Sequence, residues 1–348
     1  MTISALLTSP FPTLQMLEDY LTSLGANAAH QRRLWRAWLG LGDWSALNTK
    51  KLSLPKAVIE AVPGIRAFLE SVARVRSTHP GSEPETARLL VQLSDNKTVE
   101  SVLLPRQGVC VSSQLGCAVG CRFCMTGKGG LLRQLSDLEI VAQVALARAQ
   151  RPTTKKVVFM GMGEPSHNRE AVLSALRFLA LYGEFGHKDL VISTVGDARL
   201  FESLLAQEDI RPALAISLHT VDDEKRRHLL PKAGKLTVDE LLAFGARWGA
   251  LSGYPVQYEW TLIEGVNDSL DEMELLAQKL QGQYAMVNLI PVNAVEGSAY
   301  HRPQREHCVE CVRHLRSRGL IATLRDSAAQ DVDGGCGQLR AREVGLDG

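Results

Sequence analysis

The sequence predicts an α/β fold in which a parallel β-sheet is preceded by a small helical domain. Three observations lead to this fold class. Helical stripes of leucine and tryptophan fill residues 1 to about 75, and a polar stretch rich in proline and glycine follows at 77–84. From about residue 107 onward, short apolar or β-branched runs alternate with stretches of helical periodicity. Six or more such units imply parallel strands, because each helix returns the chain to the start of the next strand.

The first 80 residues are expected to form the helical domain. Leucines recur at the spacing of one helix face, at Leu14, Leu17, Leu21 and Leu24. A second stripe consists of Leu34, Trp35, Trp38 and Leu39. The polar residues 77–84 are typical of a linker. We therefore expect a linker and a short β extension over residues 81–105, with strand-like runs at Ala87–Leu93 and Val99–Leu104.

The alternating region, residues 106–339, is expected to form the second domain, followed by a tail at 340–348. Its strand candidates are Gly108–Ser112, Lys156–Met160, Leu190–Thr194, Ala213–Leu218, Val256–Ile263, Met286–Pro291 and Ile321–Leu324. Its helix candidates lie near residues 136–150, 168–182, 198–206, 237–248, 269–281 and 303–318. Two of them begin with a capping box, formed by Ser136 with Glu139 and by Thr237 with Glu240.

The pattern leaves the shape of the sheet open. A doubly wound open sheet and a full or partial barrel both consist of such units, and periodicity does not distinguish them. In both architectures the functional groups gather at the carboxyl ends of the parallel strands. The loops that follow the strand candidates are therefore where chemistry is expected.

Charge gives a limited indication of the partner. The whole chain has a net charge of +1, which does not by itself indicate a nucleic-acid binder. Residues 1–80 carry nine basic and five acidic side chains, and Trp35, Trp38 and Trp44 lie among them. Basic and aromatic residues together are typical of contacts to single-stranded RNA. They are also typical of a helical domain with a solvated charged face, so both interpretations stay open.

The cytoplasm is the expected compartment. No apolar run reaches the roughly 18 residues that a membrane-spanning helix needs, and the N-terminus lacks the pattern of a signal peptide. The chain has seven cysteines. In a reducing compartment a close group of cysteines more often binds metal or acts in catalysis than forms structural disulfides.

Three of the cysteines, Cys117, Cys121 and Cys124, form a C-x3-C-x2-C loop after the first strand of the alternating region. Iron–sulfur clusters are held by cysteine thiolates, normally four, so three thiolates leave one iron of a 4Fe–4S cluster open. The amino and carboxylate groups of S-adenosylmethionine (SAM) can chelate that iron, and an electron passed into the sulfonium then yields a 5′-deoxyadenosyl radical. A zinc knuckle is the competing interpretation, but it needs four ligands in two pairs. The loop therefore predicts a 4Fe–4S cluster and SAM as cofactors.

A second motif, Gly161-Met162-Gly163-Glu164-Pro165, follows the next strand. Glycines let the backbone approach a ligand closely, and a carboxylate can bind the ammonium group of the methionine moiety. The motif is not a dinucleotide fingerprint, because Ser166 stands where the third glycine would be. After the cluster loop and in this order, it is expected to form part of a SAM site.

With these motifs, six further segments make the sequence resemble the RlmN/Cfr family of radical SAM RNA adenine methyltransferases. They are Cys110–Gln114, Ser193–Thr194, Ile216–His219, Val266–Ser269, Asn288–Pro291 and Cys336–Leu339. The resemblance extends from about Val99 to Leu339 and implies a partial (β/α)6 barrel with a small N-terminal accessory domain. It also implies SAM contacts at Gly163, Glu164, Ser193, Ser217, Leu218, His219 and Asn293.

The reaction of this family requires two cysteines besides the three cluster ligands. Carbon 2 of adenine is electron-poor and the SAM methyl group is an electrophile, so direct transfer has the wrong polarity. A methyl group first placed on a thiolate can become a carbon radical and add to the ring, and a second thiolate then releases the product. The resemblance implies Cys336 as the methyl carrier, Cys110 as the resolving cysteine that forms a disulfide bond with it, and Glu100 as the base that removes the proton from carbon 2.

Several alternatives stay open. Methylation of carbon 8 is the nearest, followed by a radical enzyme with a non-RNA substrate and by a non-catalytic iron–sulfur protein that binds RNA. The family usually has a basic residue and a glycine around Ala328 and Ala329, and alanines in place of Gly334 and Gly335. A divergent paralogue with a different RNA target is therefore a further possibility.

The expected partners are an RNA substrate, either rRNA or tRNA, and a flavodoxin-type electron donor, and the chain is expected to be a monomer. The remaining cysteines, Cys308 and Cys311, form a C-x2-C on one face of a predicted helix. No second cysteine pair lies near them in the sequence, so they are expected to be packing residues rather than metal ligands.

Overall fold

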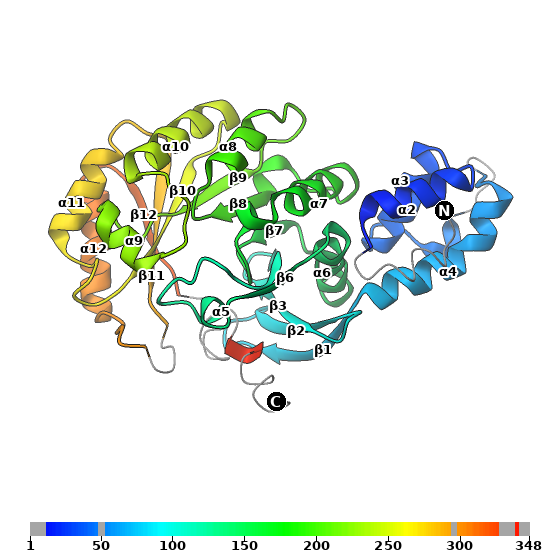
Figure 1. Cartoon of the computed structure of the whole chain (residues 1–348), viewed down its shortest axis with the longest axis horizontal. Helices are drawn as coiled ribbons and strands as arrows, with labels where there is room; N and C mark the ends of the chain where they lie inside the picture. The colour runs from blue at the N-terminus through cyan, green and yellow to red at the C-terminus, as the bar shows by residue number, and fades with distance from the viewer. Residues whose placement is uncertain (1–11, 48–52, 294–297, 327–337, 341–348) are drawn as a thin grey trace.

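The computed structural model describes residues 12–47, 53–293, 298–326 and 338–340. In this part of the chain a ten-stranded mixed sheet carries most of the helices on one face, and the N-terminal helices lie at the end of the molecule farthest from α11 and α12 (Figure 1). None of the described helices is both long and apolar enough to cross a membrane.

The described residues of the N-terminal part form three helices and one 3-10 turn. They are α2 (Leu14–Ser23), α3 (Ala28–Trp38), η1 (Trp44–Ala46) and α4 (Lys56–Val72). The side chains of Thr13 and Asn27 accept hydrogen bonds from the first turns of α2 and α3, which satisfies backbone N–H groups that have no partner inside the helix. The predicted leucine stripes are buried, with Leu17, Leu21 and Leu34 fully inaccessible to solvent.

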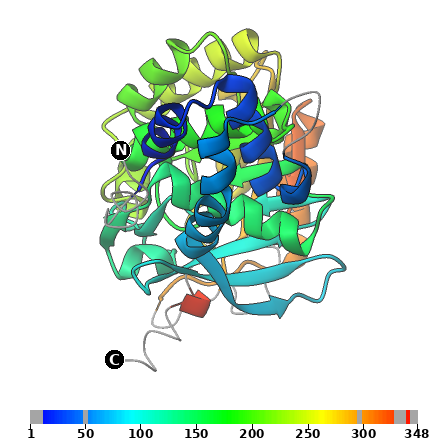
Figure 2. The same ribbon diagram turned by 90° about the vertical axis from the view of Figure 1, so that its right-hand side faces the viewer.

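Trp35 joins this helical part to the rest of the molecule, and Figure 2 views the molecule from that end. Its buried ring lies edge-on to Phe178 of α7 (Arg169–Tyr182), with 5.2 Å between the ring centroids. Trp38 contacts the same phenylalanine at 6.1 Å. Such an aromatic contact contributes roughly 0.5–1.5 kcal/mol beyond the burial of its area. Trp35 is thus a packing residue, and the interpretation of the basic side chains around it stays open.

The ten strands follow one another almost in chain order. The first three, which are antiparallel, are β1 (Ala73–Pro80), β2 (Ala87–Leu93) and β3 (Thr98–Leu104). The seven parallel strands are β4 (Gly108–Cys110), β7 (Lys156–Phe159), β8 (Leu190–Thr194), β9 (Ala213–Ser217), β10 (Val256–Leu262), β11 (Ala285–Pro291) and β12 (Ile321–Leu324). Among the described residues β1 and β12 are the two edges, so the sheet does not close. The predicted α/β class with a partial barrel is confirmed, with β12 as a seventh parallel strand.

Helices connect the parallel strands and cover one face of the sheet. They are α6 (Asp137–Gln150), α7, α8 (Ala198–Leu205), α10 (Val238–Ser252), α11 (Leu270–Lys279) and α12 (Arg305–Ser317). Both predicted capping boxes are present, at the start of α6 and of α10. Each substitution of such a cap typically costs about 1 kcal/mol.

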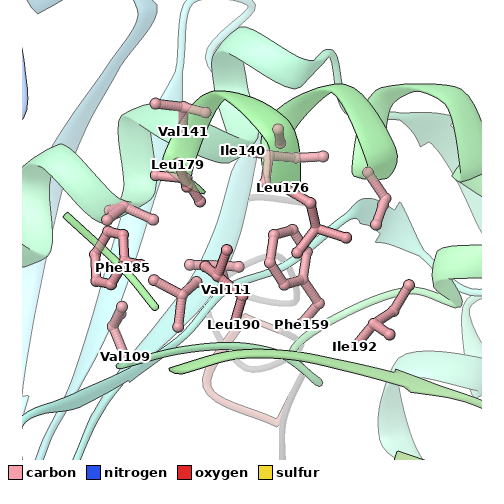
Figure 3. Packing of buried hydrophobic residues seen from close by; sticks show 14 of the residues in the cluster. Val109, Val111, Ile140, Val141, Phe159, Leu176, Leu179, Phe185, Leu190 and Ile192 are labelled. Carbon is pink, nitrogen blue, oxygen red and sulfur yellow. The ribbon is translucent and has the colours of Figure 1, made fainter. Parts of the chain in front are cut away.

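The core lies between the sheet and these helices. Alternate residues of the strands, such as Val109, Phe159 and Ile192, point toward Ile140 of α6 and Leu176 of α7 (Figure 3). Burying a side chain of this size contributes about 1.5–3 kcal/mol. The other residues of each strand therefore point to the opposite side, which we call the inner face of the sheet.

Three segments differ from the sequence prediction. Residues 77–80, expected in a linker, complete β1, because their backbone pairs with β2 and their side chains alternate between half-buried and exposed. The helical part therefore ends at Val72 rather than at residue 80. A short hairpin, β5 (Gln114–Gly116) with β6 (Leu131–Gln134), and helix α9 (Asp223–Leu229) were not predicted. Strands and helices this short display too few residues for a period to be recognised.

Candidate active site

The cluster loop lies inside the β5–β6 hairpin, so a short strand separates it from β4. It ends at the single turn of α5 (Met125–Lys128). Gly116 has a φ of 86°, and a Cβ atom there would lie 2.0 Å from the carbonyl oxygen of Gly130. A Cβ atom on Gly127 would lie 3.0 Å from Cα of Gly120. Only glycine allows the two arms of the hairpin and the two ends of the loop to approach this closely.

The three cysteines of the loop are thiols that are shielded from solvent. Cys117 is 8% exposed, and Cys121 and Cys124 are half-buried. Burial, followed by the nearby Cys124 and Glu164, raises the pKa of Cys117 to about 12. Burial also raises the pKa of Cys121 well above its usual range, with Cys124 and Cys117 as further causes. Without a cation Cys117 and Cys121 hold their protons, so iron must displace these protons when it binds.

The geometry of the loop fits a cluster better than a single ion. No three His, Cys, Asp or Glu side chains of the described chain converge closely enough to hold one metal ion. A 4Fe–4S cluster takes each thiolate on a different iron, so its ligands need not converge on one point. Cys117 and Cys121 nevertheless belong to one small apolar cluster, and the Cys124 N–H donates to the Cys121 carbonyl (3.1 Å), so the three cysteines lie close together.

Glu164 connects the ends of two neighbouring strands. One carboxylate oxygen accepts hydrogen bonds from the Ser166 N–H (2.9 Å) and the Thr194 hydroxyl (2.5 Å), and the other accepts from the Val195 N–H (3.0 Å). Its own N–H donates to the side-chain oxygen of Gln114 at 2.6 Å. A carboxylate offers about four acceptor positions, so one remains for a ligand.

Gly163, the residue before Glu164, has a φ of 108°, and a Cβ atom there would lie 2.6 Å from Cβ of Gln114. The turn after β7 is thereby pressed against the start of the cluster hairpin. Gln114 was noted in the sequence only as part of a longer motif, and the structure shows it as the contact between these two segments.

The other predicted SAM contacts lie at the carboxyl ends of β8, β9 and β11. Ser193 and Leu218 are buried, Ser217 is half-buried, and Asn293 is half-buried just beyond β11. Ser217 pairs with Glu259 of β10, and Glu259 pairs with Asn288 of β11. The structure thus brings these residues together at the carboxyl-terminal ends of the parallel strands.

His219 contacts the cluster loop directly. It adopts a left-handed conformation with a φ of 64°, and its ring lies edge-on to Phe123 with 5.0 Å between centroids. Its Nδ1 accepts a hydrogen bond from the Thr261 N–H at 2.9 Å, so the neutral ring carries its proton on Nε2. Burial, together with the positive charge of Arg226, lowers the pKa of His219 to about 3.

Two buried charged residues near the strand ends were missed by the sequence analysis. Arg226 of α9 is 4% exposed, and its guanidinium donates to backbone carbonyls at the ends of β8 and β9. Glu259 accepts a hydrogen bond from Asn288 at 2.7 Å, and burial raises the pKa of Glu259. Arg226 stands in a run of charged residues and Glu259 in an apolar strand, so neither position differs from an ordinary surface or strand residue in the sequence.

Glu100 and Cys110 lie on the inner face of the sheet. Cys110 pairs with Val102 across the antiparallel β3–β4 ladder, so their side chains share a face. Glu100 precedes Val102 by two residues and therefore points the same way. Cys110 is 6% exposed and Glu100 is 1% exposed.

The Glu100 carboxylate has a partner on each oxygen. Oε2 accepts a hydrogen bond from Nη1 of Arg88 on β2 at 2.8 Å, and both side chains are 1% exposed. Oε1 accepts from the backbone N–H of Arg340 at 2.9 Å. The last described turn of the chain, residues 338–340, is thereby fastened to Glu100. Cys336, the predicted methyl carrier, lies outside the described residues.

Cys308 and Cys311 are fully buried on α12. The Cys311 thiol donates to the backbone carbonyl of Asp268 at 3.4 Å, and burial raises the pKa of Cys311 to about 12. Both cysteines pack in the core between α12 and the sheet, as expected for packing residues. The six cysteines of the described residues form no disulfide with one another.

Comparisons with known proteins agree with this geometry. A model of the radical SAM superfamily matches residues 111–277. A probable RNA methyltransferase from Azoarcus sp. (strain BH72) is 54% identical over 335 residues, 95% of either chain. One from Pseudomonas paraeruginosa is 53% identical over 334 residues, 95% of this chain and 96% of that protein. The crystal structure of a radical SAM methyltransferase from Sphaerobacter thermophilus is similar with a TM-score of 0.79 and 35% identity, covering 94% of this chain and 97% of that one. The similarity therefore includes the N-terminal helices as well as the barrel.

Proposed function

The chain belongs to the radical SAM methyltransferases, and from this premise we propose that it methylates carbon 2 of an adenine in RNA, through a methyl group carried on Cys336. The family uses a 4Fe–4S cluster and SAM, and Cys117, Cys121 and Cys124 are the residues that hold the cluster. When bound, the cluster supplies the single electron that cleaves SAM to a 5′-deoxyadenosyl radical. The assignment to the RlmN/Cfr group of this family is part of the proposal.

RNA as the substrate is supported by the relatives and by the N-terminal part. Proteins more than 50% identical over 95% of the chain are named probable RNA methyltransferases. Residues 1–80 have a net charge of +4, and Arg32, Arg33 and Arg36 lie together on α3. We propose that this basic helix contacts the phosphates of rRNA or tRNA. A base within a helix would have to be flipped out, at a cost of a few kcal/mol.

The chemistry at carbon 2 requires the two further cysteines. The Cys336 thiolate takes the methyl group of one SAM. Abstraction of a hydrogen atom leaves a methylene radical, which adds to carbon 2. Glu100 accepts the carbon 2 proton, and one electron passes to the oxidised cluster, so that the aromatic ring is restored. The Cys110 thiolate then attacks the Cys336 sulfur, which breaks the carbon–sulfur bond, forms a disulfide and leaves the ring-bound carbon to take up a proton.

The observation that carries the proposal is the grouping around Glu100. Cys110 and Glu100 share the inner face on adjacent strands. The backbone N–H of Arg340 donates to the Glu100 carboxylate. Cys336 lies four residues before Arg340 in the sequence, so the Cα atoms of Cys336 and Arg340 are at most about 14 Å apart. The length of the connecting chain therefore allows the base, the resolving thiol and the methyl carrier to meet at one site.

We propose that SAM binds at the carboxyl-terminal ends of the parallel strands, with the following contacts. Glu164 has one acceptor position left for the ammonium group, and Gly163 lets the turn that carries it pack against Gln114. His219 offers a protonated Nε2 as a donor, and Ser193, Ser217, Leu218 and Asn293 complete the set. We further propose a flavodoxin-type protein as the electron donor and a monomeric, cytoplasmic enzyme.

The test is an anaerobic reconstitution with iron, sulfide and SAM, followed by addition of cellular RNA and mass spectrometry of the nucleosides. The wild type should produce 2-methyladenosine, and Cys336→Ala should produce none. Cys308→Ala, which removes a cysteine of the core, is the matched control and should remain active. If the product is 8-methyladenosine the ring position is wrong, and if no RNA nucleoside is methylated the RNA proposal fails.

A further inference from the structure

Arg226 is a buried guanidinium whose hydrogen-bond partners carry no net charge. Its Nη2 donates to the carbonyl oxygens of Val195 (2.5 Å) and Ser217 (3.1 Å), and its Nε donates to that of Leu218 (3.3 Å). Within the described chain no carboxylate accepts a hydrogen bond from it. Carbonyl dipoles offset a full charge only in part, and a charge removed from water is costly unless an anion lies near. We therefore expect a negatively charged group close to Arg226.

The cluster loop contacts the end of the helix that carries Arg226 and the residues just after it. The backbone N–H of Arg122 donates to the Leu229 carbonyl (3.0 Å), and the N–H of Lys232 donates to the Val119 carbonyl (3.1 Å). Leu229 also belongs to the small apolar cluster that contains Cys117. Helix α9 is thus fastened to the loop on both sides of its central cysteine.

Glu164 lies on the other side of Arg226. Val195, whose carbonyl accepts from Arg226, donates its own N–H to Glu164. Burial lowers the pKa of Arg226 to about 10, and attraction to Cys121, Asp223 and Glu164 opposes that effect. The negative groups near Arg226 are therefore Glu164, Asp223 of the same helix and, once iron replaces its proton, Cys121.

We propose that Arg226 is a positioning residue that supplies a fixed positive charge to the cluster and thereby raises its reduction potential. The three thiolates give the site negative charge, and reduction adds one more electron. A buried cation stabilises the reduced form more than the oxidised form, because the interaction grows with the charge and is poorly screened in a site of low dielectric. Net charge around a cluster is one of the factors that set its potential.

The test is a redox titration of the reconstituted, SAM-free cluster with dithionite, followed by electron paramagnetic resonance of the reduced form. Arg226→Met should shift the midpoint to a more negative potential, and Arg226→Lys should keep it near that of the wild type. Arg227→Met is the matched control, since it removes the same charge from an exposed neighbour and should leave the midpoint unchanged. An Arg226→Met cluster that titrates at the wild-type potential overturns the proposal, as does a shift seen only after SAM is added, which would place the charge on the SAM carboxylate instead.

Arg226→Met also removes three hydrogen bonds, so the iron content of each variant must be measured. Arg226→Gln is a second neutral variant that keeps one amide donor. If both neutral variants lose iron while Arg226→Lys retains it, the charge is required by the cluster and the proposal holds. If Arg226→Lys loses iron to the same extent, the guanidinium acts only through its geometry and the proposal is wrong. Neither reading depends on methyl transfer, so the outcome is separate from that of the proposed function.

Discussion

Arg88 and Glu100 form a buried ion pair. Each is 1% exposed, and a 2.8 Å hydrogen bond joins them. Arg88→Met leaves the carboxylate buried without its cation, which typically costs about 3–5 kcal/mol of unfolding free energy. The double variant with Glu100→Gln should recover much of that loss, because it removes the second charge as well. Urea denaturation of the single and double variants measures both effects.

The control for this pair is Arg74→Met, an exposed arginine whose Nε donates to Gln92 across the neighbouring β1–β2 pair. It should change the unfolding free energy by less than about 0.5 kcal/mol. An Arg88→Met variant as stable as this control would show that Glu100 does not depend on Arg88. Because Glu100 is the proposed base, Arg88→Met should also impair removal of the carbon 2 proton and cause a covalent RNA–protein adduct to accumulate.

His219 is a single residue that makes the unfolding free energy depend on pH. Its folded pKa of about 3 lies below the ordinary value of 6.5, owing first to burial and then to Arg226. The unfolded chain therefore binds the extra proton first. The stability that the neutral ring contributes is complete above pH 6.5 and is lost as the pH falls toward 3, at up to about 1.4 kcal/mol per pH unit.

Thermal unfolding at pH 7.0, 6.0 and 5.0 measures this dependence. His219→Asn tolerates the left-handed backbone and cannot titrate, so its unfolding free energy should fall less steeply between these values. Equal slopes for the two proteins would contradict the assignment of a neutral, buried histidine.

At the scale of elements, the β5–β6 hairpin decides whether the cluster loop can form. Gly116→Ala would force a left-handed conformation on a residue with a Cβ, at a cost of about 1–2 kcal/mol, and would place that atom 2.0 Å from the Gly130 carbonyl. We expect lower iron content after reconstitution. In the same hairpin a Cβ atom on Gly129 would have no other atom within 4 Å, so Gly129→Ala should bind iron like the wild type. A Gly116→Ala protein with full iron content would show that the hairpin can rearrange.

The elements also show how far the sequence could be interpreted without coordinates. The strands from β7 to β12 and the capped helices α6 and α10 were predicted within a few residues, because their apolar periods and capping boxes are local signals. Strand β1 was missed because its stability comes from pairing with β2, a tertiary contact that overrides the polar composition of Ala73–Pro80. The hairpin and α9 were missed because they are short, although they hold the cluster loop.

The candidate site divides in the same way. The sequence predicts the cluster cysteines from their spacing and the Gly163–Glu164 turn from its place after the cluster loop. Arg88 and Arg226 could not, since a buried arginine looks like any other charged residue until the fold supplies its partners. Their roles belong to packing rather than to motifs.

At the scale of the whole molecule, two parts of different composition must act on one substrate. The basic helices pack on the barrel through Trp35 and Phe178. The proposed SAM contacts lie at the carboxyl-terminal ends of the parallel strands. In the proposed function the first part binds RNA and the second part delivers a carbon atom to adenine. The most specific claim for the molecule is the route of that carbon atom, from SAM through Cys336 to the ring.

Isotope labelling of the SAM methyl group tests this route most directly. With SAM that carries a fully deuterated methyl group, several turnovers should produce 2-methyladenosine whose methyl group retains two deuterium atoms. The third should appear in 5′-deoxyadenosine, because the radical removes it before carbon–carbon bond formation. Mass spectrometry of both products distinguishes the outcomes by one mass unit. A product that retains all three deuterium atoms would mean direct methyl transfer and would contradict the account.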